Sequence, residues 1–360
     1  MWYFSRLKTG LSQFDEITKM TQKVSEITNS ALVTGATGFV GGNLASRLIA
    51  DGWTVKVLVR DASRLSPSLR SGTEIIRGGL ADTDVVRRAV RGVNIIFHCA
   101  ANVSTWDAWD AYYAANVQGA KNLMQAIVSD NPGLSRLVHV STVDVYGFPV
   151  TPCDEQCQTS GGGFGYGETK RLGEEQVRTI ADTHRIPYTI IRPCNIIGPG
   201  SQFISRIGRE LESGLMLTVD GGSANAGLVF IDNLVDDLIW ASRSEKTGGE
   251  CYNVRDDYDV NWKTVLGVLR KGINGKGLTL DLPFFIADLL ATSMETLYKV
   301  SRVAREPVLH RLLVRIFGRT CGHSARKIRT DRGYTHQIGF DEAMNRCCQW
   351  YMDTRIQQDR

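Results

Sequence analysis

Short apolar runs alternate with stretches of helical periodicity through the first two thirds of this 360-residue chain. Runs with the length and composition of buried strands lie at residues 31–34, 55–59, 74–77, 93–98, 136–140 and 187–191. Helix-compatible spacing separates most of these runs, at residues 43–50, 82–90, 114–128 and 166–184. Such alternation is typical of βαβ units, so we predict an α/β fold built on a doubly wound parallel sheet.

The pattern loosens beyond Pro193, where glycines and prolines interrupt the chain. Residues 228–231 form another apolar run, and we expect this run to return to the sheet. Asp232 follows it in a position that would cap a helix over residues 233–241. The later residues predict helices and short strands of a smaller lobe.

The first predicted strand leads into a glycine-rich turn that we predict to bind a cofactor through Gly35, Thr37, Gly38, Phe39, Val40 and Gly41. A strand, a glycine turn and a helix in succession place backbone N–H groups and a helix N-terminus against a pyrophosphate. The glycines allow a tight turn and close packing of the helix on the strand. Their spacing is GxxGxxG rather than GxGxxG.

This motif suggests a division of the chain into three parts. We expect an N-terminal extension (1–29), a dinucleotide-binding domain (30–193, with 228–253 returning to it) and a substrate-binding lobe (194–227 and 254–360). The extension fits a weakly amphipathic helix and a frayed tail equally well.

The end of the second predicted strand bears on the choice between NAD and NADP. Arg60 and Asp61 follow that strand directly. A basic residue there accommodates the 2′-phosphate of NADP, whereas an acidic residue binds the ribose of NAD. We favour Arg60 as the cofactor contact, and hence NADP(H), but NAD(H) is possible if Asp61 faces the ribose.

Tyr166 and Lys170 are the strongest candidates for chemistry. A four-residue spacing on a helix puts them on one face, one turn apart. An ammonium beside a phenol favours the phenolate, so we expect Lys170 to lower the tyrosine pKa toward the working range of a general acid or base.

Composition excludes several other classes of protein. The net charge of +4 is too small to imply nucleic acid, and no RNA-binding motif occurs. The eight cysteines form no CxxC pair and the six histidines no ligand pair, so we expect no metal. We see no signal peptide and no apolar stretch of about 18–20 residues that would span a bilayer. We therefore expect a cytoplasmic protein.

Seven segments in family order resemble the extended short-chain dehydrogenase/reductase family: 34–41, 98–101, 116–119, 140–147, 166–170, 192–193 and 231–234. The resemblance implies a Rossmann-type domain with NAD(P) in an extended groove. It implies that Tyr166 is the acid/base, that Lys170 orients the nicotinamide ribose, and that Thr142, with Ser141 as the fallback, holds the substrate oxygen. It also implies cofactor contacts at Ala100, Ala101, Asn116 and Pro193. Our candidate substrate contacts are Ser104, Trp106, Asp144 and Asn195.

One departure from the family pattern concerns the adenine. The family often has Gly-Asp-Leu after the third strand, whereas this chain has Gly78-Gly79-Leu80. The acidic contact is therefore either lost or moved to Asp82. The closest resemblance is to the 3β-hydroxysteroid and sterol-4-carboxylate dehydrogenase group and to the dihydroflavonol-reductase-like group.

The C-terminal third suggests the kind of substrate. Residues 282–294 and 309–317 are apolar, and residues 295–332 carry ten Lys/Arg against three acids. A basic, apolar lobe fits a lipid-like substrate or peripheral membrane contact, but we prefer ordinary helix packing with a solvated basic face.

We therefore expect a homodimeric NAD(P)-dependent oxidoreductase that interconverts a secondary alcohol and a ketone on a hydrophobic steroid-, lipid- or polyketide-like substrate. The alternative is a nucleotide-sugar epimerase/dehydratase with tightly bound NAD. A third hypothesis, a redox-inactive NAD(P)-binding regulator, is opposed by the intact Thr-Tyr-Lys set.

Overall fold

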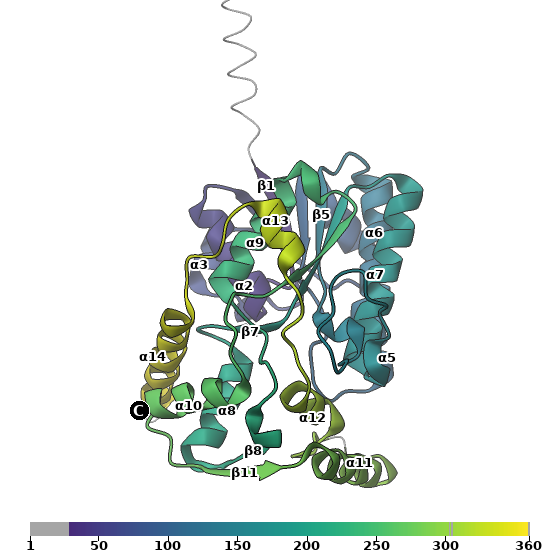
Figure 1. Cartoon of the computed structure of the whole chain (residues 1–360). Coiled ribbons are helices and arrows are strands. Elements are labelled where there is room, and N and C mark those ends of the chain that lie inside the picture. The colour runs from purple at the N-terminus through teal and green to yellow at the C-terminus, as the bar shows by residue number, and fades with distance from the viewer. Residues whose placement is uncertain (1–28, 302, 304, 359–360) are drawn as a thin grey trace, which may run out of the picture.

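The structure is a computed structural model that describes residues 29–358 except 302 and 304. Its centre is a seven-stranded parallel sheet with the strand order β10-β6-β5-β4-β1-β2-β3 (Figure 1). The strands are β1 (Ser30–Thr34), β2 (Thr54–Val59), β3 (Glu74–Arg77), β4 (Ile95–His98), β5 (Arg136–Val140), β6 (Tyr188–Pro193) and β10 (Glu250–Val254). The predicted doubly wound parallel sheet is confirmed.

Helices cover both faces of this sheet and enclose two hydrophobic cores. One layer packs α4 (Thr83–Val90), α6 (Gly119–Asp130) and α7 (Gly165–His184) on the sheet. The other layer contains α2 (Phe39–Ala50), α3 (Pro67–Gly72) and α9 (Ile231–Arg243). Strand interiors such as Leu32 and Val33 alternate between the two cores and are fully buried, which explains the continuous apolar runs in the sequence.

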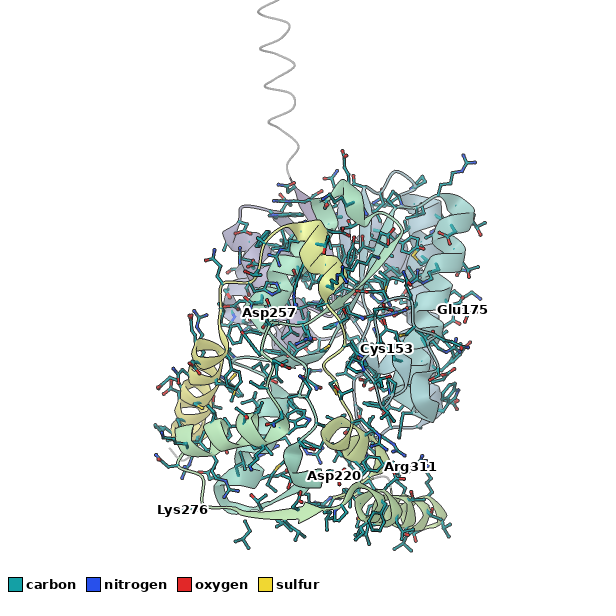
Figure 2. All side chains as sticks on the ribbon, in the orientation of Figure 1. Cys153, Glu175, Asp220, Asp257, Lys276 and Arg311 are labelled. Carbon is teal, nitrogen blue, oxygen red and sulfur yellow. The ribbon has the colours of Figure 1, made fainter. Side chains whose placement is uncertain are left out.

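A smaller lobe lies beyond the carboxyl ends of the strands, in the lower half of Figure 1. It contains two parallel two-stranded sheets, β7 (Asn195–Ile197) with β9 (Leu228–Phe230) and β8 (Leu215–Val219) with β11 (Leu278–Leu282). Its helices are α8 (Gln202–Ser213), α10 (Trp262–Gly272), α11 (Phe284–Val300), α12 (Arg311–Gly318) and α14 (Phe340–Gln358). Lys276, Asp220 and Arg311 mark its lower edge in Figure 2.

Two local predictions about the second half of the chain are wrong. Residues 228–230 do not return to the main sheet but pair with β7, and the main sheet is completed by β10 alone. Asp232 does not cap α9, because it lies in the first turn and pairs with Arg346 at 3.0 Å. The carboxylate of Asp256 instead accepts the Phe230 N–H at 2.7 Å at the start of this helix.

The helix predicted over residues 114–128 is longer and less regular than expected. It begins with α5 (Trp109–Tyr113) and passes through a π-helical turn (Ala114–Gln118) before it continues as α6. The predicted extension falls almost entirely on residues 1–28, which lie outside the described residues. Of the helices that the structure describes, none combines the length and apolar character needed to cross a bilayer.

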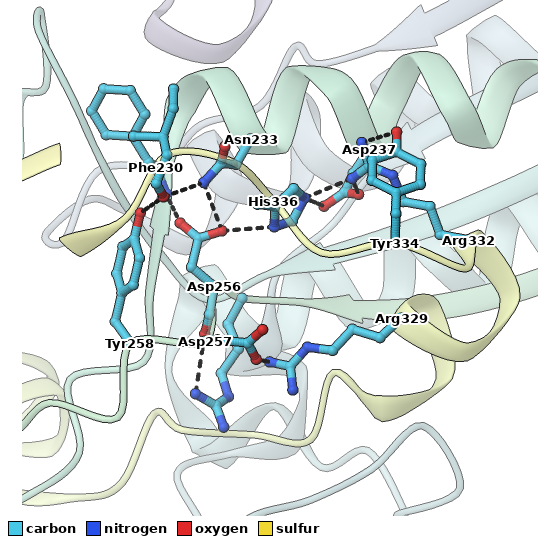
Figure 3. Close-up of polar contacts among 12 residues, drawn as sticks. Phe230, Asn233, Asp237, Asp256, Asp257, Tyr258, Arg329, Arg332, Tyr334 and His336 are labelled. Atoms are coloured by element: carbon cyan, nitrogen blue, oxygen red, sulfur yellow. Dashed lines mark hydrogen bonds and ion pairs between the residues drawn. The ribbon is translucent and has the colours of Figure 1, made fainter. Parts of the chain in front are cut away.

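A buried cluster of charges ties the segment between α13 (Arg326–Arg332) and α14 to α9 (Figure 3). His336 Nδ1 lies 2.8 Å from Asp256 Oδ1, and its Nε2 lies 2.9 Å from Asp237 Oδ2. Arg332 pairs with Asp237 as well, and it bonds the hydroxyl of Tyr334. Both carboxylates are fully buried, so they depend on these cations for compensation.

The imidazole of His336 is held in its charged form by this cluster. Burial alone lowers its pKa, but hydrogen bonds to Asp237 and Asp256 and the charges of both carboxylates raise it to about 9. Arg332 Nη1 approaches Nε2 to 2.6 Å, which opposes protonation, yet two carboxylates outweigh one guanidinium.

Candidate cofactor and active site

The glycine turn after β1 is built so closely that side chains would not fit at two positions. Gly35 has φ +76°, and a Cβ there would lie 2.7 Å from the Ala100 nitrogen. A Cβ on Gly41 would lie 2.4 Å from the Gly35 carbonyl oxygen. The turn therefore brings α2, β1 and the chain after β4 into direct backbone contact.

The N-terminus of α2 opens onto this turn. Its N-cap residue is Gly38, and no side chain caps the helix. The N–H groups of the first helical turn have no partner within the helix, so they are available to an anion. A pyrophosphate fits this position, with Thr37, Phe39 and Val40 beside it in the chain. Ala100, whose nitrogen donates to Thr34 Oγ1 at 3.2 Å, lies beneath the turn with Ala101 following it.

The end of β2 separates the two candidates for the adenosine ribose. Arg60 is exposed, and its side chain lies over Gly79, whose added Cβ would meet Arg60 Cγ at 3.5 Å. Asp61 is engaged locally, because its carboxylate accepts the N–H and the hydroxyl of Ser63 at 2.9 and 2.7 Å. These hydrogen bonds with Ser63 lower the pKa of Asp61. Asp82 caps α4 through the Val85 N–H at 3.2 Å.

The residues predicted to do chemistry meet at the carboxyl end of β5. Tyr166 and Lys170 lie one turn apart on α7, and Thr142 follows β5 at the start of a 3-10 turn (Val143–Tyr146). The Thr142 hydroxyl accepts the Asp144 N–H at 3.2 Å, and it acts on Tyr166 to lower the pKa of that phenol. Lys170 is buried, and its Nζ donates to the Val140 carbonyl at 2.6 Å. The buried hydroxyl of Ser141 has no partner among the described residues, so Ser141 stays the fallback candidate.

The prediction that the tyrosine pKa is lowered is wrong. Burial raises the pKa of Tyr166, the nearby Asp144 carboxylate raises it further, and only the Thr142 hydrogen bond opposes them. Burial also lowers the pKa of Lys170 to about 8, although the charges of Glu174 and Cys99 act to raise it. Desolvation and a neighbouring carboxylate therefore set the protonation of this phenol, so Tyr166 holds its proton at neutral pH.

A chain of buried polar groups stands behind Lys170. Glu174, one turn further along α7, accepts two hydrogen bonds from Arg192 at 2.8 and 2.5 Å. Arg192 donates to Tyr146 Oη at 2.9 Å, and Tyr146 donates to Asn253 Oδ1 at 2.8 Å. These contacts fix α7 against β6 and β10. The spacing of Lys170 and Glu174 was the one available signal for this network, and our sequence analysis missed it.

Asn116 lies in the π-helical turn and binds protein groups at both ends of its amide. Its Oδ1 accepts the Asn102 N–H at 2.7 Å, and its Nδ2 donates to the Asn102 carbonyl at 3.1 Å and to Thr169 Oγ1 at 3.0 Å. The turn packs so closely on α7 that a Cβ on Gly173 would lie 2.5 Å from the Asn116 carbonyl oxygen. Asn116 thus ties the chain after β4 to α7. Its contact with a cofactor stays a prediction. The cofactor contact of Pro193, at the end of β6, stays a prediction as well.

The four candidate substrate contacts differ in their partners, and their contact with a substrate stays a prediction. Asp144 joins the Tyr166 group, and burial raises its pKa to about 7 against a hydrogen bond from Thr142. Asn195 is committed to the Ala226 carbonyl at 2.7 Å. Ser104 and Trp106 lie on the loop after β4, where Trp106 packs on His310 of the smaller lobe with ring centroids 6.0 Å apart.

Tyr112 is a further aromatic residue at this site, which the sequence did not single out as functional. Its hydroxyl donates to the Ser104 carbonyl at 2.7 Å, and its ring lies 2.7 Å from the place of a Cβ on Gly165, next to Tyr166. Within the described residues, no group of histidine, cysteine or acidic side chains has a metal-binding arrangement.

Comparison with known proteins defines the class to which this fold and site belong. A match to the NAD dependent epimerase/dehydratase family covers residues 31–254, more than half of the chain. The chain therefore belongs to this family, the extended short-chain dehydrogenases/reductases. It is an enzyme of the NAD(P)-dependent dehydrogenase/reductase class.

Individual relatives are distant but aligned over most of their length. The 2-alkyl-3-oxoalkanoate reductase of Stenotrophomonas maltophilia is 28% identical over 330 residues, 88% of this chain and 97% of that protein. The human sterol-4-alpha-carboxylate 3-dehydrogenase, decarboxylating, is 26% identical over 335 residues, 90% of this chain and 88% of that protein. The solved structure of MoeE5 in complex with UDP-glucuronic acid and NAD has a TM-score of 0.72 at 21% identity, covering 90% and 99% of the two chains.

Proposed function

We propose that this enzyme interconverts a secondary alcohol and a ketone on a hydrophobic substrate, with Tyr166 as its general acid and base. The observation that carries the proposal is the group at the end of β5, where Thr142 follows the strand and Tyr166 and the buried Lys170 lie one turn apart on α7. The names of a reductase of alkyl-oxoalkanoates and of a sterol dehydrogenase among the relatives support this substrate class.

The chain's own groups supply proton transfer and charge stabilisation. When bound, the nicotinamide cofactor exchanges a hydride with the carbonyl carbon of the substrate. In the reducing direction Tyr166 donates its phenolic proton to the carbonyl oxygen, which becomes the hydroxyl of the alcohol. The Thr142 hydroxyl donates to the same oxygen and stabilises its developing negative charge. Because burial and Asp144 raise the pKa of Tyr166, the phenol holds its proton at neutral pH, which suits reduction.

For the cofactor we propose NADP(H), bound with its pyrophosphate at the N-terminus of α2. Exposed Arg60 supports the 2′-phosphate contact, and the engagement of Asp61 with Ser63 supports it further. The NAD in the MoeE5 structure belongs to a distant neighbour that shows the fold alone.

A direct test uses purified protein with NADPH or NADH and a panel of ketones that runs from short alkyl-oxoacids to steroids. We expect consumption of NADPH that rises with substrate hydrophobicity and is lost in Tyr166→Phe. Turnover that is equal in the wild type and Tyr166→Phe would contradict the assignment of the acid.

One observation favours a second candidate, a nucleotide-sugar epimerase or dehydratase. Asp144 provides a titratable carboxyl beside Tyr166, and its pKa of about 7 suits proton transfer. Such an enzyme would retain its cofactor. NAD that stays with the protein through gel filtration, with turnover of UDP-sugars and none of ketones, would decide for this candidate.

A further inference from the structure

The two-stranded sheet of β8 and β11 carries leucine at most positions of one face, where Val219 is the exception. In its parallel register Leu215 pairs with Leu278 and Leu217 with Leu280, so these side chains point to the same side. The alternate residues Met216 and Thr218 point inward and are buried. On the leucine face, Leu278 is 74% exposed, Leu215 50% and Leu280 46%.

Helix α11 continues this apolar surface along the lower edge of the molecule (Figure 1). Its inner face packs through Ala287 and Ala291 in a core to which Leu217 and Leu282 also belong. Its outer face is exposed and apolar at Phe285, Leu289, Leu290, Leu297 and Val300. Ordinary helix packing, preferred from the sequence, therefore accounts for only half of this helix. We call the exposed residues of β8, β11 and α11 the apolar patch: Leu215, Leu278, Leu280, Phe285, Leu289, Leu290, Leu297 and Val300.

Cations border the apolar patch at both ends. Lys271 and Lys276 lie exposed between α10 and β11, and neither pairs with a carboxylate in the described part of the chain. Arg311, at the start of α12, lies at the opposite end of the edge from Lys276 (Figure 2). Lys299 is exposed on α11 itself and pairs with Glu295 at 3.6 Å, and Arg311 lies 3.9 Å from Asp288.

The acidic residues of the same region are turned to internal partners. Asp281 accepts the Gly221 N–H and the Thr218 hydroxyl, each at 2.8 Å. Asp288 pairs with Arg315 at 3.0 Å. The exposed cations Lys271 and Lys276, which pair with no carboxylate in the described part of the chain, are therefore available to a partner at this edge.

The far end of α11 contacts the loop that leads to the active site. Lys299 Nζ lies 5.8 Å from the ring centroid of Trp106, and Thr105 Oγ1 donates to Glu306 Oε1 at 2.7 Å. Asn116 holds the start of the same loop through Asn102. A partner seated on the apolar patch would thus lie beside this loop.

We infer that the apolar patch docks onto the surface of an anionic lipid bilayer. Leucine and phenylalanine side chains enter the boundary between headgroups and acyl chains, while the bordering lysines and arginines meet anionic headgroups. The positive charge at the border of the apolar patch argues against a second copy of the chain as the partner, because a two-fold contact would bring two basic borders together. The inference goes beyond the proposed function and does not depend on it.

The test is co-sedimentation of the full-length protein with vesicles of phosphatidylcholine containing about 30% phosphatidylserine, compared with phosphatidylcholine alone. We expect binding to the anionic vesicles that weakens as salt shortens the Debye length. In the double variant Leu289→Asp/Leu297→Asp, at positions 66% and 63% exposed, we expect binding to fall at least about tenfold. Thermal unfolding of the variant shows whether it folds like the wild type.

A second variant and a matched control keep the test decisive. Lys271→Glu/Lys276→Glu changes only exposed cations and should also weaken anionic binding about tenfold or more. The control variant Val150→Asp replaces an exposed apolar residue, 78% exposed, on the loop that contains Cys153. Cys153 lies well above this edge in Figure 2. We expect this variant to bind vesicles like the wild type. The absence of wild-type binding at low salt overturns the inference. The inference is also overturned if the wild type is a dimer that dissociates in Leu289→Asp/Leu297→Asp while vesicle binding is unchanged.

Discussion

Replacement of His336 by glutamine tests the buried charge cluster of Figure 3 through the pH dependence of stability. The ordinary imidazole pKa is 6.5, and in the folded protein it is raised to about 9. The stabilisation is therefore fully present below about pH 6.5 and is lost as the pH rises through about 9. At about 1.4 kcal/mol for each pKa unit, the protonated imidazole contributes about 3 kcal/mol to the free energy of unfolding. Its side chain is only 15% exposed, so solvent screens little of this.

The assay is urea unfolding of the wild type and H336Q at several pH values from about 6 to about 9.5. We expect the variant to be less stable by up to about 3 kcal/mol at the low end and to approach the wild type at the high end. The range stays above about pH 6 because burial raises the pKa of Asp237, whose protonation would release the same ion pairs. H184Q, at an exposed histidine in the last turn of α7, is the matched control. A difference between wild type and H336Q that does not change with pH would refute the reasoning.

Three further predictions concern the candidate site. Tyr166→Phe removes the transferable proton with little change in volume, so kcat should fall at least ~100-fold with cofactor affinity nearly unchanged, as steady-state kinetics and cofactor titration would show. Arg60→Ala should weaken NADP(H) by about 1.5–3 kcal/mol and leave NAD(H) almost unaffected in calorimetric titrations; an equal loss for both cofactors would make Arg60 structural. Gly41→Ala places a Cβ 2.4 Å from a backbone oxygen and should abolish cofactor binding or lower the melting temperature, whereas Gly267→Ala, where nothing lies within 4 Å, should do neither.

The sequence was most informative where local pattern and tertiary structure agree. Strands β1, β4, β5 and β6 are buried on both faces, so they appear in the sequence as apolar runs that need no knowledge of their partners. Residues 228–230 form a similar run, but an apolar run does not specify which strand it pairs with, and this one pairs with β7. The π-helical turn had no sequence signal, because it depends on the close approach of Gly173 to the Asn116 backbone.

The candidate site shows the same limit. The spacing of Tyr166 and Lys170 placed both residues on one helix face, as the structure has them. The pKa of Tyr166 is raised by burial and by Asp144, and the pKa of Lys170 is lowered by burial, which a helix pattern cannot reveal. The exposure of the outer face of α11 was not predictable for a related reason: periodicity identifies an apolar face but does not say whether another element covers it.

The order of strands in the main sheet has a consequence for synthesis of the chain. β6 pairs with β5 on one side, and its other edge stays open until β10, which begins at Glu250, has left the ribosome. At about 5–20 residues per second, the stretch between Pro193 and Glu250 takes roughly 3–11 s to make. During that time the unpaired edge of β6, which carries Ile190 and Ile191, is a template for pairing with another chain. The nascent protein is therefore exposed to aggregation in this interval, after Tyr166 and Lys170 have been made and before its sheet is closed.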